Sequence, residues 1–426
     1  MPAADIRPRV VVVGGGIAGL VAARELVLAG RDVTLVEKSA HLGGQVARHS
    51  VAGIDLDAGA EAYATRGDEL PRLLATLGLA DDIVTPTPAP AWVQRATGGA
   101  VPLPATSLLG IPGVPLAQDV IDAIGFPAAL RAQLDMLMPS LVGSKSATVG
   151  ELVRRRMGRA VLDGLVAPVA RGVHSTDPDQ LDLDRAAPGL RQALMSTGSL
   201  GQAVRSLRDK APAGSLVASL RGGMFRLVDA LAADLDRFGV QVRTSTEVTA
   251  YDAGGVTLES GERLRGEVLL AAPLDVDATR TRVQVATIAV DAPALADAPR
   301  GTGVLVAPGV AGVGARALTH LTAKWAWLAE QTPLQLLRLS YDDGVEVTTE
   351  LARRDAEVLL GTPIPTPVDA AQVAWERVGR RADAQHAIDG MHRVGEAESG
   401  TGLAAVVSYA RSIVGAIPPR GSAGEG

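Results

Sequence analysis

The chain opens with short apolar runs separated by polar or glycine-rich positions. Val10–Val13 is apolar throughout, which predicts a buried strand. Leu20–Ala29 is rich in alanine and leucine and predicts a helix, and Asp32–Val36 predicts a second strand. A strand, a helix and a second strand in this order form the first half of a parallel α/β unit.

The turn between the first strand and the helix consists of glycine and small apolar residues. Its residues are Gly14, Gly15, Gly16, Ile17, Ala18 and Gly19. In such a turn the first glycine permits a tight bend, the second lets the backbone approach a pyrophosphate, and the last lets helix and strand pack closely. The helix N-terminus also offers free N–H groups to phosphates. With these flanking elements the turn predicts a dinucleotide site in preference to a turn without a ligand.

An acidic residue and a second pair of glycines follow the second strand. Glu37 stands at the tip of that strand, where a carboxylate can accept hydrogen bonds from a ribose. Lys38 comes next, and Gly43 and Gly44 lie a few residues further on. This extension is typical of flavoproteins in which FAD lies extended across the domain, so FAD is favoured over NAD(P). The alternative for the glycine pair is a flexible loop.

Composition narrows the class of protein. The chain has 426 residues, of which 47% are apolar, and a formal net charge of −6. It is long enough for two domains or an interleaved pair, and its scattered charges argue against a nucleic-acid partner. The absence of cysteine excludes disulfides, thiolate catalysis, Fe–S clusters and a thioether to flavin. None of the six histidines pairs with another ligand type at metal-binding spacing, so no metal is expected.

The hydropathy pattern bears on location. No charged-then-apolar leader precedes Val10, and charges or prolines interrupt every long apolar run. The sequence therefore predicts a cytoplasmic protein without a membrane-spanning segment. A peripheral membrane contact stays open as an alternative, because an amphipathic surface patch does not show in a hydropathy scan.

The pattern changes twice further along the chain. From Ala117 to Arg208 apolar residues recur at helical spacings, and from Val217 strands and helices alternate again. The predicted fold class is α/β, with a Rossmann-type FAD-binding domain, an interleaved substrate-binding domain built on a mixed sheet, and a helical cap. The expected FAD-binding domain comprises residues 1–80, 210–275 and 385–426, the cap on the membrane side residues 81–209, and the substrate-binding domain residues 276–384. Later helices are predicted at Arg226–Phe238, Val345–Leu360 and Gly402–Ile417.

Six segments resemble known flavoproteins: Val10–Val46, Gly53–Arg66, Ala100–Pro115, Pro168–Leu183, Ser219–Leu231 and Val394–Val407. The first resembles the amine-oxidase-like flavoprotein superfamily, and the others are similar to its porphyrinogen oxidases. The block Pro168–Leu183 looks like one that amine oxidases lack. Because the segments span nearly the whole chain in order, the chain resembles the FAD-dependent protoporphyrinogen/coproporphyrinogen III oxidase family.

This resemblance implies an FAD-dependent oxidoreductase that oxidises coproporphyrinogen III to coproporphyrin III in bacterial haem biosynthesis. Molecular oxygen would be the acceptor and hydrogen peroxide the product. Protoporphyrinogen IX is the alternative substrate. An amine oxidase or a carotenoid desaturase is a further alternative, although four Trp, four Tyr and three Phe leave little material for an aromatic cage. The alternative outside enzymes is a non-catalytic FAD-binding protein that acts as partner of a haem-pathway enzyme.

The resemblance also implies cofactor contacts. In chain order they are Gly59, Ala60, Glu61 and Ala62 along the isoalloxazine, the Val248 backbone at the adenine, Gly395 and Glu396 beside the ribityl chain, and Thr401, Gly402 and Leu403 at the start of a helix that points to the flavin. The dipole of that helix would stabilise negative charge on reduced flavin. No protein residue is assigned a catalytic role, because N5 of the flavin carries the chemistry.

Two arginines are candidate ligands for the carboxylates of the substrate, because a guanidinium can bind a carboxylate bidentately. Arg66 ranks first because it follows the segment beside the flavin, and Arg171 ranks second. For each of them a solvated surface position is the alternative. The chain departs from the family after Trp375, where the segment is shorter and lacks the usual proline–tyrosine pattern. The role of Trp375 and of the active-site roof is therefore left open.

Overall fold

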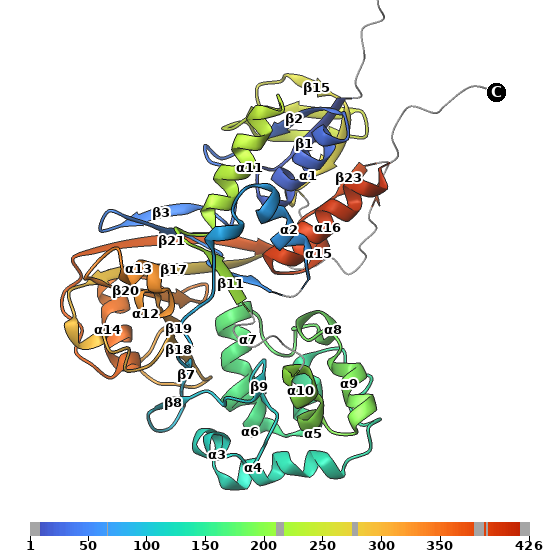
Figure 1. The fold of residues 1–426 in the computed structure, drawn as a ribbon. Coiled ribbons are helices and arrows are strands. Elements are labelled where there is room, and N and C mark those ends of the chain that lie inside the picture. The colour runs from blue at the N-terminus through green and yellow to red at the C-terminus, as the bar shows by residue number, and fades with distance from the viewer. Residues whose placement is uncertain are drawn as a thin grey trace, which may run out of the picture.

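The computed structural model describes residues 9–65, 67–209, 217–274, 280–378, 387–388 and 391–417. These residues form three units: one around a parallel sheet, one around a larger mixed sheet, and a helical unit (Figure 1). In the view of Figure 1 the parallel-sheet unit lies at the top, the mixed sheet at the left and the helical unit at the bottom. The predicted α/β class with added helices is confirmed.

The parallel sheet is assembled from strands that lie far apart in the chain. Its order is β12-β2-β1-β16-β23-β22, and all neighbours run parallel except the last pair. The first two predicted strands are confirmed as β1 and β2. The strands are β1 (Arg9–Val13), β2 (Asp32–Val36), β12 (Gln241–Arg243), β16 (Glu267–Leu270), β22 (Ala387–Ile388) and β23 (Met391–Arg393).

Three helices pack together beside this sheet: α1 (Ile17–Leu28), α11 (Phe225–Arg237) and α16 (Leu403–Ala416). Leu20 and Val407 are fully buried in one apolar cluster, which includes side chains from the strands. Since α1 contacts the sheet, α11 and α16, nearly every side of it must be apolar. Helix α1 begins at Ile17, before the predicted Leu20, because Gly16 is extended (φ −72°, ψ 176°) and serves as the N-cap.

The mixed sheet has seven strands in the order β21-β17-β20-β19-β18-β7-β8. Helix α14 (Thr349–Leu360) packs on one face of it through a separate apolar core. The strands are β7 (Trp92–Gln94), β8 (Ala100–Pro102), β17 (Arg280–Val290), β18 (Gly303–Val306), β19 (Ala315–His320), β20 (Gln335–Tyr341) and β21 (Asp369–Val378).

Two details of the mixed-sheet unit differ from the prediction. Residues 92–102 fall within the stretch assigned to the helical cap, yet β7 pairs with β18 and β8 pairs with β7, so this stretch extends the mixed sheet. Strands of three residues carry too short a pattern to be predicted. Helix α14 begins later than the predicted Val345, because Thr348 Oγ1 accepts the Leu351 N–H (3.0 Å) and caps the helix there.

The helical unit has its own buried core, in which Leu152, Leu165 and Val204 are fully buried. The helical pattern predicted from Ala117 to Arg208 is confirmed. Helix α7 lies at the upper end of this unit and contacts β18 and β19 of the mixed sheet (Figure 1). The helices are α3 (Gln118–Ile124), α4 (Phe126–Gln133), η2 (Leu134–Leu137), α5 (Val149–Arg156), α6 (Arg159–Val161), η3 (Leu162–Val166), α7 (Ala167–His174), α8 (Leu183–Ala186), α9 (Leu190–Thr197) and α10 (Leu200–Asp209).

The remaining short elements lie within or between the three units. Strand β11 begins at Val217, where strands and helices are predicted to alternate again, but it pairs with β5 and β6 and stays outside the parallel sheet. The short elements are β3 (Arg48–Val51), β4 (Ile54–Asp57), β5 (Tyr63–Ala64), α2 (Glu69–Thr76), η1 (Ala80–Asp82), β6 (Ile83–Val84), β9 (Ser107–Leu108), β10 (Ile111–Pro112), β11 (Val217–Leu220), β13 (Val248–Asp252), β14 (Gly255–Leu258), β15 (Arg263–Arg265), η4 (Pro293–Leu295), α12 (Leu321–Lys324), α13 (Ala326–Ala329) and α15 (Glu396–Ser399).

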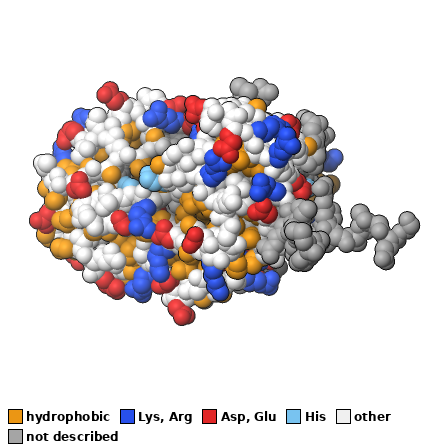
Figure 2. All heavy atoms as spheres, turned by 90° about the horizontal axis from the view of Figure 1, so that it is seen from above, with side chains coloured by type: hydrophobic (Ala, Val, Ile, Leu, Met, Phe, Trp, Pro, Cys, Tyr) orange, Lys and Arg blue, Asp and Glu red, His pale blue; other side chains and the backbone are white. Residues whose placement is uncertain are grey.

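The face of the molecule on the side of the parallel sheet carries no single-sign charged region. On the face shown in Figure 2, basic and acidic side chains are intermixed, and apolar ones lie between them. Within the described ranges, no helix combines the length and the apolar character that crossing a membrane requires.

Candidate functional site

The carboxyl ends of the parallel strands bring three distant segments of the chain to one edge. Ala271 N–H donates to the Val13 carbonyl (2.8 Å), which sets the end of β16 beside the end of β1. Val394 N–H in turn donates to the Leu270 carbonyl (2.9 Å), which sets the end of β23 beside β16. Ligands of open parallel sheets bind at such an edge, because the loops that follow the strands gather there.

The glycine turn after β1 has the geometry that its sequence predicts. Gly14 adopts a φ of +109°, and a Cβ on Gly19 would lie 1.9 Å from the Gly14 carbonyl oxygen, so both positions require glycine. A Cβ on Gly16, in contrast, would meet no protein atom within 4 Å. Gly16 caps α1 without a side-chain hydrogen bond. The turn therefore presents an open space in front of the N–H groups of the first turn of α1, including those of Ile17 and Ala18, which fits a pyrophosphate.

Glu37 lies beside this turn and shapes it. Its carboxylate accepts hydrogen bonds from the Gly15 N–H (2.6 Å) and from the Ser39 N–H (2.8 Å). A carboxylate has further lone pairs, so Glu37 can still accept hydrogen bonds from a ribose. Lys38 is exposed next to it. The Thr246 N–H donates to the Glu37 carbonyl (2.9 Å), which brings the segment before Val248 to the same end of the sheet.

The second glycine pair packs directly on the first. Gly43 N–H donates to the Gly15 carbonyl (2.8 Å), and a Cβ on Gly44 would lie 3.3 Å from Gly16 Cα. Gly43 and Gly44 both adopt positive φ values, and their contacts give the pair a defined place beside the first turn.

Gln45 continues this line of contacts toward the segment assigned to the isoalloxazine. Its carbonyl accepts the Ala60 N–H (2.9 Å), and a Cβ on Gly59 would lie 2.0 Å from that carbonyl oxygen. The Gln45 amide donates to Glu396 Oε2 (2.8 Å). Gln45 therefore joins the predicted Gly59–Ala62 segment to the predicted tail residues, although sequence reasoning did not single it out.

The tail of the chain lies against the glycine turn. A Cβ on Gly395 would lie 3.5 Å from the Ala271 carbonyl oxygen and 3.9 Å from Ala18 Cβ. Gly402, with a φ of +110°, precedes α16 and lacks a side-chain cap, while Thr401 is exposed and Leu403 is buried against the core that contains α1. The N-terminus of α16 thus has unsatisfied N–H groups, as an electronegative ligand would require.

Glu61 connects the parallel-sheet unit to the mixed sheet. Its carboxylate binds Lys324 Nζ and accepts from Arg338 Nη1 (3.3 Å). Arg338 also donates to the carbonyls of Ala58 and Gly59. Burial raises the pKa of the Glu61 carboxyl, but the charges and hydrogen bonds of Lys324 and Arg338 outweigh burial and hold this pKa below its usual value. Glu61 is therefore an ionised carboxylate between two cations.

Asp57 holds the other end of the same segment. Its carboxylate accepts the N–H groups of Met224 and Phe225 (both 3.0 Å) at the start of α11. Burial raises the pKa of Asp57 to about 6, and these two hydrogen bonds oppose that rise. Asp57, Lys324 and Arg338 did not emerge from the sequence, because no local pattern shows which distant groups a charged side chain will meet.

The structure also locates the candidate substrate residues. Arg171, on α7, donates to Asp342 Oδ2 (2.6 Å) just beyond β20. Trp375 is partly buried and lies in β21 opposite Val283 of β17, so it belongs to the regular sheet. Arg66 falls outside the described residues.

Taken together, the described residues fit a dinucleotide cofactor. The turn at Gly14–Gly19 suits a pyrophosphate, Glu37 suits a ribose, and a continuous line of backbone contacts leads from that turn to Gly59–Ala62 and Gly395–Glu396. Within the described ranges, His, Asp and Glu side chains form no group of three or more that could hold a metal ion.

Comparisons with known proteins agree with this geometry. A family model of flavin-containing amine oxidoreductases matches residues 17–307. The chain is 32% identical to coproporphyrinogen III oxidase of Mycobacterium leprae over 362 residues, which cover 78% of this chain and 76% of the relative. It is 27% identical to the Propionibacterium freudenreichii protein of that name, over 62% of this chain and 56% of the relative. A rice protein named chloroplastic protoporphyrinogen oxidase is 29% identical over 60% of this chain and 50% of its own.

Solved structures share the fold. The crystal structure of a putative protoporphyrinogen oxidase from Exiguobacterium superposes with a TM-score of 0.80 at 24% identity, over 96% of this chain and 98% of that one. A putrescine oxidase bound to putrescine superposes with a TM-score of 0.64 at 15% identity, over the same shares of the two chains. At these identities the likeness establishes the fold alone, and the family model adds a flavin as cofactor.

Gly16→Ala tests whether the open space at the turn is a flavin site. The backbone at Gly16 suits alanine and no protein atom crowds its Cβ, so the variant should fold normally. A methyl group there would obstruct the pyrophosphate, and the dissociation constant of the flavin should rise at least about tenfold. The measurement is flavin bound per protein, with the melting temperature of the flavin-free protein. Gly415→Ala, at another uncrowded position, is the control. Equal flavin in both variants and in the wild type would contradict the assignment.

Proposed function

The chain belongs to the family of flavin-containing amine oxidoreductases, and from this premise we propose that it is an FAD-dependent coproporphyrinogen III oxidase that uses molecular oxygen and releases hydrogen peroxide. The observation that carries the proposal is the alignment with relatives named coproporphyrinogen III oxidase, which includes one at 32% identity over 78% of this chain. The site supports it, because the turn Gly14–Gly19 with the second glycine pair (the cradle) fits a dinucleotide, and the segment Gly59–Ala62, glycine or alanine except at Glu61, links it to the mixed sheet.

FAD is the flavin that these residues would hold. Gly14–Gly19 and the N-terminus of α1 would bind the pyrophosphate, Glu37 the ribose, and the Val248 backbone the adenine. Gly59–Ala62 would lie along the isoalloxazine and Gly395-Glu396 along the ribityl chain, with Lys38, Gly43 and Gly44 beside the turn. Bound flavin supplies the hydride acceptor and passes electrons to oxygen. A mononucleotide would leave Glu37 and the cradle without a ligand.

The protein itself supplies position, charge and exclusion of water. The parallel-sheet unit would hold the cofactor, the inward face of the mixed sheet would hold the porphyrinogen, and the helical unit would cover both. Helix α16 would direct its N-terminal N–H groups toward the flavin ring, where they would stabilise negative charge on reduced flavin. Lys324 and Arg338 carry two positive charges and Glu61 only one negative charge, so this cluster has a net positive charge beside Gly59–Ala62. Arg66, next along the chain, would bind a carboxylate of the substrate.

Protoporphyrinogen IX is the second candidate substrate, since the rice relative bears that activity in its name. Both porphyrinogens share the ring that is oxidised and differ in their side chains. The carboxylate-binding groups of this chain therefore decide which porphyrinogen it prefers, and a direct assay distinguishes the two.

Anaerobic mixing of the flavin-loaded protein with each porphyrinogen tests the proposal. Coproporphyrinogen III should bleach the flavin band at roughly 450 nm, and porphyrin fluorescence and hydrogen peroxide should appear on admission of air. Protoporphyrinogen IX should bleach it more slowly. Faster bleaching by protoporphyrinogen IX would make it, and not coproporphyrinogen III, the preferred substrate. Bleaching by an amine or a carotenoid alone would overturn the proposal in favour of those activities, and a flavin that nothing reduces would favour a non-catalytic partner of a haem-pathway enzyme.

A peripheral membrane contact is the second part of the proposal, and it rests on the helical unit. Helix α4, η2 and the loop after them expose large apolar side chains at spacings of four and three: Phe126, Leu130, Leu134, Leu137 and Leu141. Leu137 is 76% exposed and Leu141 is 71% exposed. The only acidic residue between positions 126 and 145 is Asp135, whereas Lys145 is exposed there. This combination suits a surface of anionic lipid.

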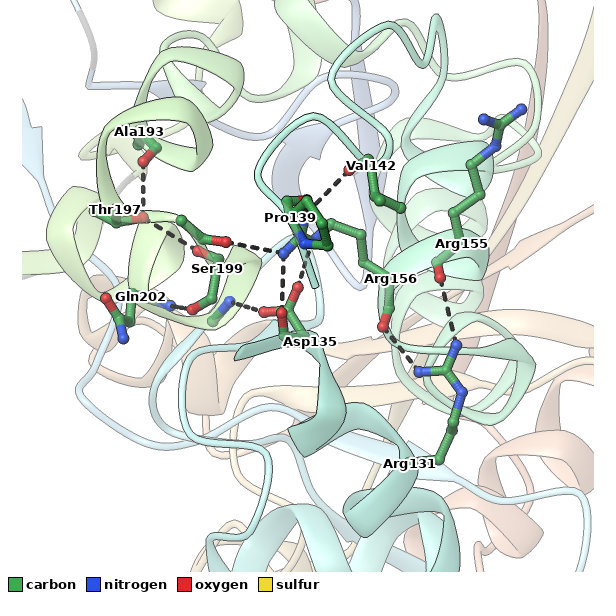
Figure 3. A network of polar contacts seen from close by, with 12 residues as sticks. Arg131, Asp135, Pro139, Val142, Arg155, Arg156, Ala193, Thr197, Ser199 and Gln202 are labelled. Atoms are coloured by element: carbon green, nitrogen blue, oxygen red, sulfur yellow. Dashed lines mark hydrogen bonds and ion pairs between the residues drawn. The ribbon is translucent and has the colours of Figure 1, made fainter. Parts of the chain in front are cut away.

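A buried ion pair holds this segment in place from beneath (Figure 3). Arg156 is fully buried and binds Asp135. It also donates to the carbonyls of Pro139, Val142 and Gly198 (all 3.0 Å). The network thus neutralises Asp135 and fixes the loop that carries Leu141, so that the exposed apolar side chains keep one orientation.

The double variant Leu137→Glu, Leu141→Glu tests the membrane contact. Loss of two apolar side chains and gain of two negative charges should weaken binding to vesicles of phosphatidylglycerol and phosphatidylcholine at least about tenfold. The measurement is co-sedimentation of protein with vesicles. Val358→Glu, at an exposed apolar position on α14, is the matched control and should bind as the wild type does. Wild-type protein that does not sediment with vesicles, or that self-associates through this face instead, would refute the contact.

A further inference from the structure

Two arginines share one carboxylate at the C-terminal end of α7. Arg171, on the helix, donates to Asp342 Oδ2 (2.6 Å), and Arg316, on β19, donates to Asp342 Oδ1 (3.1 Å). Arg316 Nη2 donates to Ser175 Oγ (2.8 Å). Ser175 ends α7 in the left-handed region (φ +50°), a conformation that costs a non-glycine residue energy and often occurs at functional sites.

A third arginine, Arg377 on β21, closes the group on the cofactor side. It binds Glu396 through Nε (3.2 Å) and Nη2 (2.9 Å), and it donates to the His174 carbonyl. Glu396 also accepts from Gln45, so both of its carboxylate oxygens have a hydrogen-bond partner. The three arginines therefore stand between α7, the mixed sheet and the tail segment assigned to the flavin.

This cluster carries more positive charge than the described carboxylates balance. Arg377 pairs with Glu396, so Asp342 is the one described carboxylate that pairs with both Arg171 and Arg316. The Arg316 side chain is 6% exposed, and its Nε has no hydrogen-bond partner among the described residues. Burial lowers the pKa of Arg316; Asp342 opposes this, and the charges of Arg377 and Arg171 add to it. Arg316 is a buried cation that shares its counter-ion and has an N–H without a partner in the described part of the chain. Burying such a group costs free energy unless an anion binds to it.

A β-bulge directs Arg316 into this position. Ala315 pairs with Tyr341 and Ala317 pairs with Ser340, so Arg316 is the extra residue between them. Such a bulge re-aims a side chain relative to the regular alternation of the strand. The strand is thus irregular at Arg316, the residue that bonds Ser175.

We propose that Arg316 and Arg171, with Arg377 beside them, form a subsite for a carboxylate of the porphyrinogen side chains, and this inference rests on the proposed function. A guanidinium binds a carboxylate through paired hydrogen bonds, and Arg316 has one N–H to offer while Arg171 can turn from Asp342. Coproporphyrinogen carries four carboxylates and protoporphyrinogen two. The subsite selects the tetracarboxylate by holding one of the two carboxylates that protoporphyrinogen lacks, and Asp342 acts as the internal anion that the substrate displaces.

Two variants with opposite expected effects test the subsite. Arg316→Gln removes the buried cation, and the flavin-loaded protein should bind coproporphyrin III about tenfold more weakly. Asp342→Asn removes the competing anion and should bind coproporphyrin III several times more tightly; the Asp342 side chain is 47% exposed, so the variant should fold. Protoporphyrin IX should respond less to both changes. The measurement is quenching of porphyrin fluorescence on titration with protein.

The control is Arg354→Gln, which removes an exposed arginine of α14 and should leave affinity unchanged. A purely structural clamp between the units predicts that Asp342→Asn weakens binding or leaves it unchanged, and either result would overturn the subsite. If the wild type binds coproporphyrin and Arg316→Gln binds it equally well, the subsite fails while the proposed function stands. If the wild type binds neither porphyrin and neither porphyrinogen reduces its flavin, the proposed function fails as well.

Discussion

One carboxylate, that of Glu61, holds the mixed sheet against the segment assigned to the flavin. Lys324 and Arg338 come from the mixed-sheet unit, and both bind Glu61. Removing one partner of this mostly buried pair leaves an uncompensated charge, which costs about 2–4 kcal/mol at such partial exposure. Arg338 also donates to the backbone carbonyls of Ala58 and Gly59. The position of the proposed substrate face relative to Gly59–Ala62 therefore depends on this cluster.

On the side of the glycine turn, backbone contacts rather than ion pairs hold the segment Gly59–Ala62 in place. The line from Gly19 through Gly43 and Gln45 to Gly59 is so tight that added Cβ atoms would overlap carbonyl oxygens or neighbouring side chains. Such contacts fix the distances between these backbone segments, because no flexible side chain lies between them. Fixed distances suit a cofactor that binds along the line. Gly16, where a Cβ would meet nothing, is the exception, and it lies where the pyrophosphate would approach. The glycine turn and the Glu61 cluster thus lie at the two ends of one continuous line of contacts.

The sequence predicted those parts of the site that follow from local rules. The turn Gly14–Gly19, the strand before it and the helix after it are local, because each glycine answers a steric need of its neighbours. Gly395 and Gly402 are assigned to the site by the resemblance of the tail, and the structure brings Gly395 close to Ala18. The short strands at residues 92–102 were missed, since strands of three residues carry almost no periodicity.

Charged partners were the other part that sequence could not supply. Lys324, Arg338 and Arg316 sit in strands or short helices whose pattern shows burial but not which carboxylate each side chain will meet. Arg171 was a candidate by residue type, yet its pairing with Asp342 depends on how α7 meets the end of β20. Such pairs are a property of the assembled units, so a single sequence without tertiary contacts leaves them undetermined.

The most direct test of this account is a double-mutant cycle on Glu61 and Lys324 in the flavin-loaded protein. Urea unfolding would give the free energy of unfolding for the wild type, Glu61→Gln, Lys324→Met and the double variant. If the pair holds the mixed sheet in place, each single variant should lose about 2–4 kcal/mol, and the double variant should lose clearly less than their sum, with a coupling of about 2 kcal/mol. Losses that add to within about 0.5 kcal/mol would contradict the account, because the two residues would then act independently.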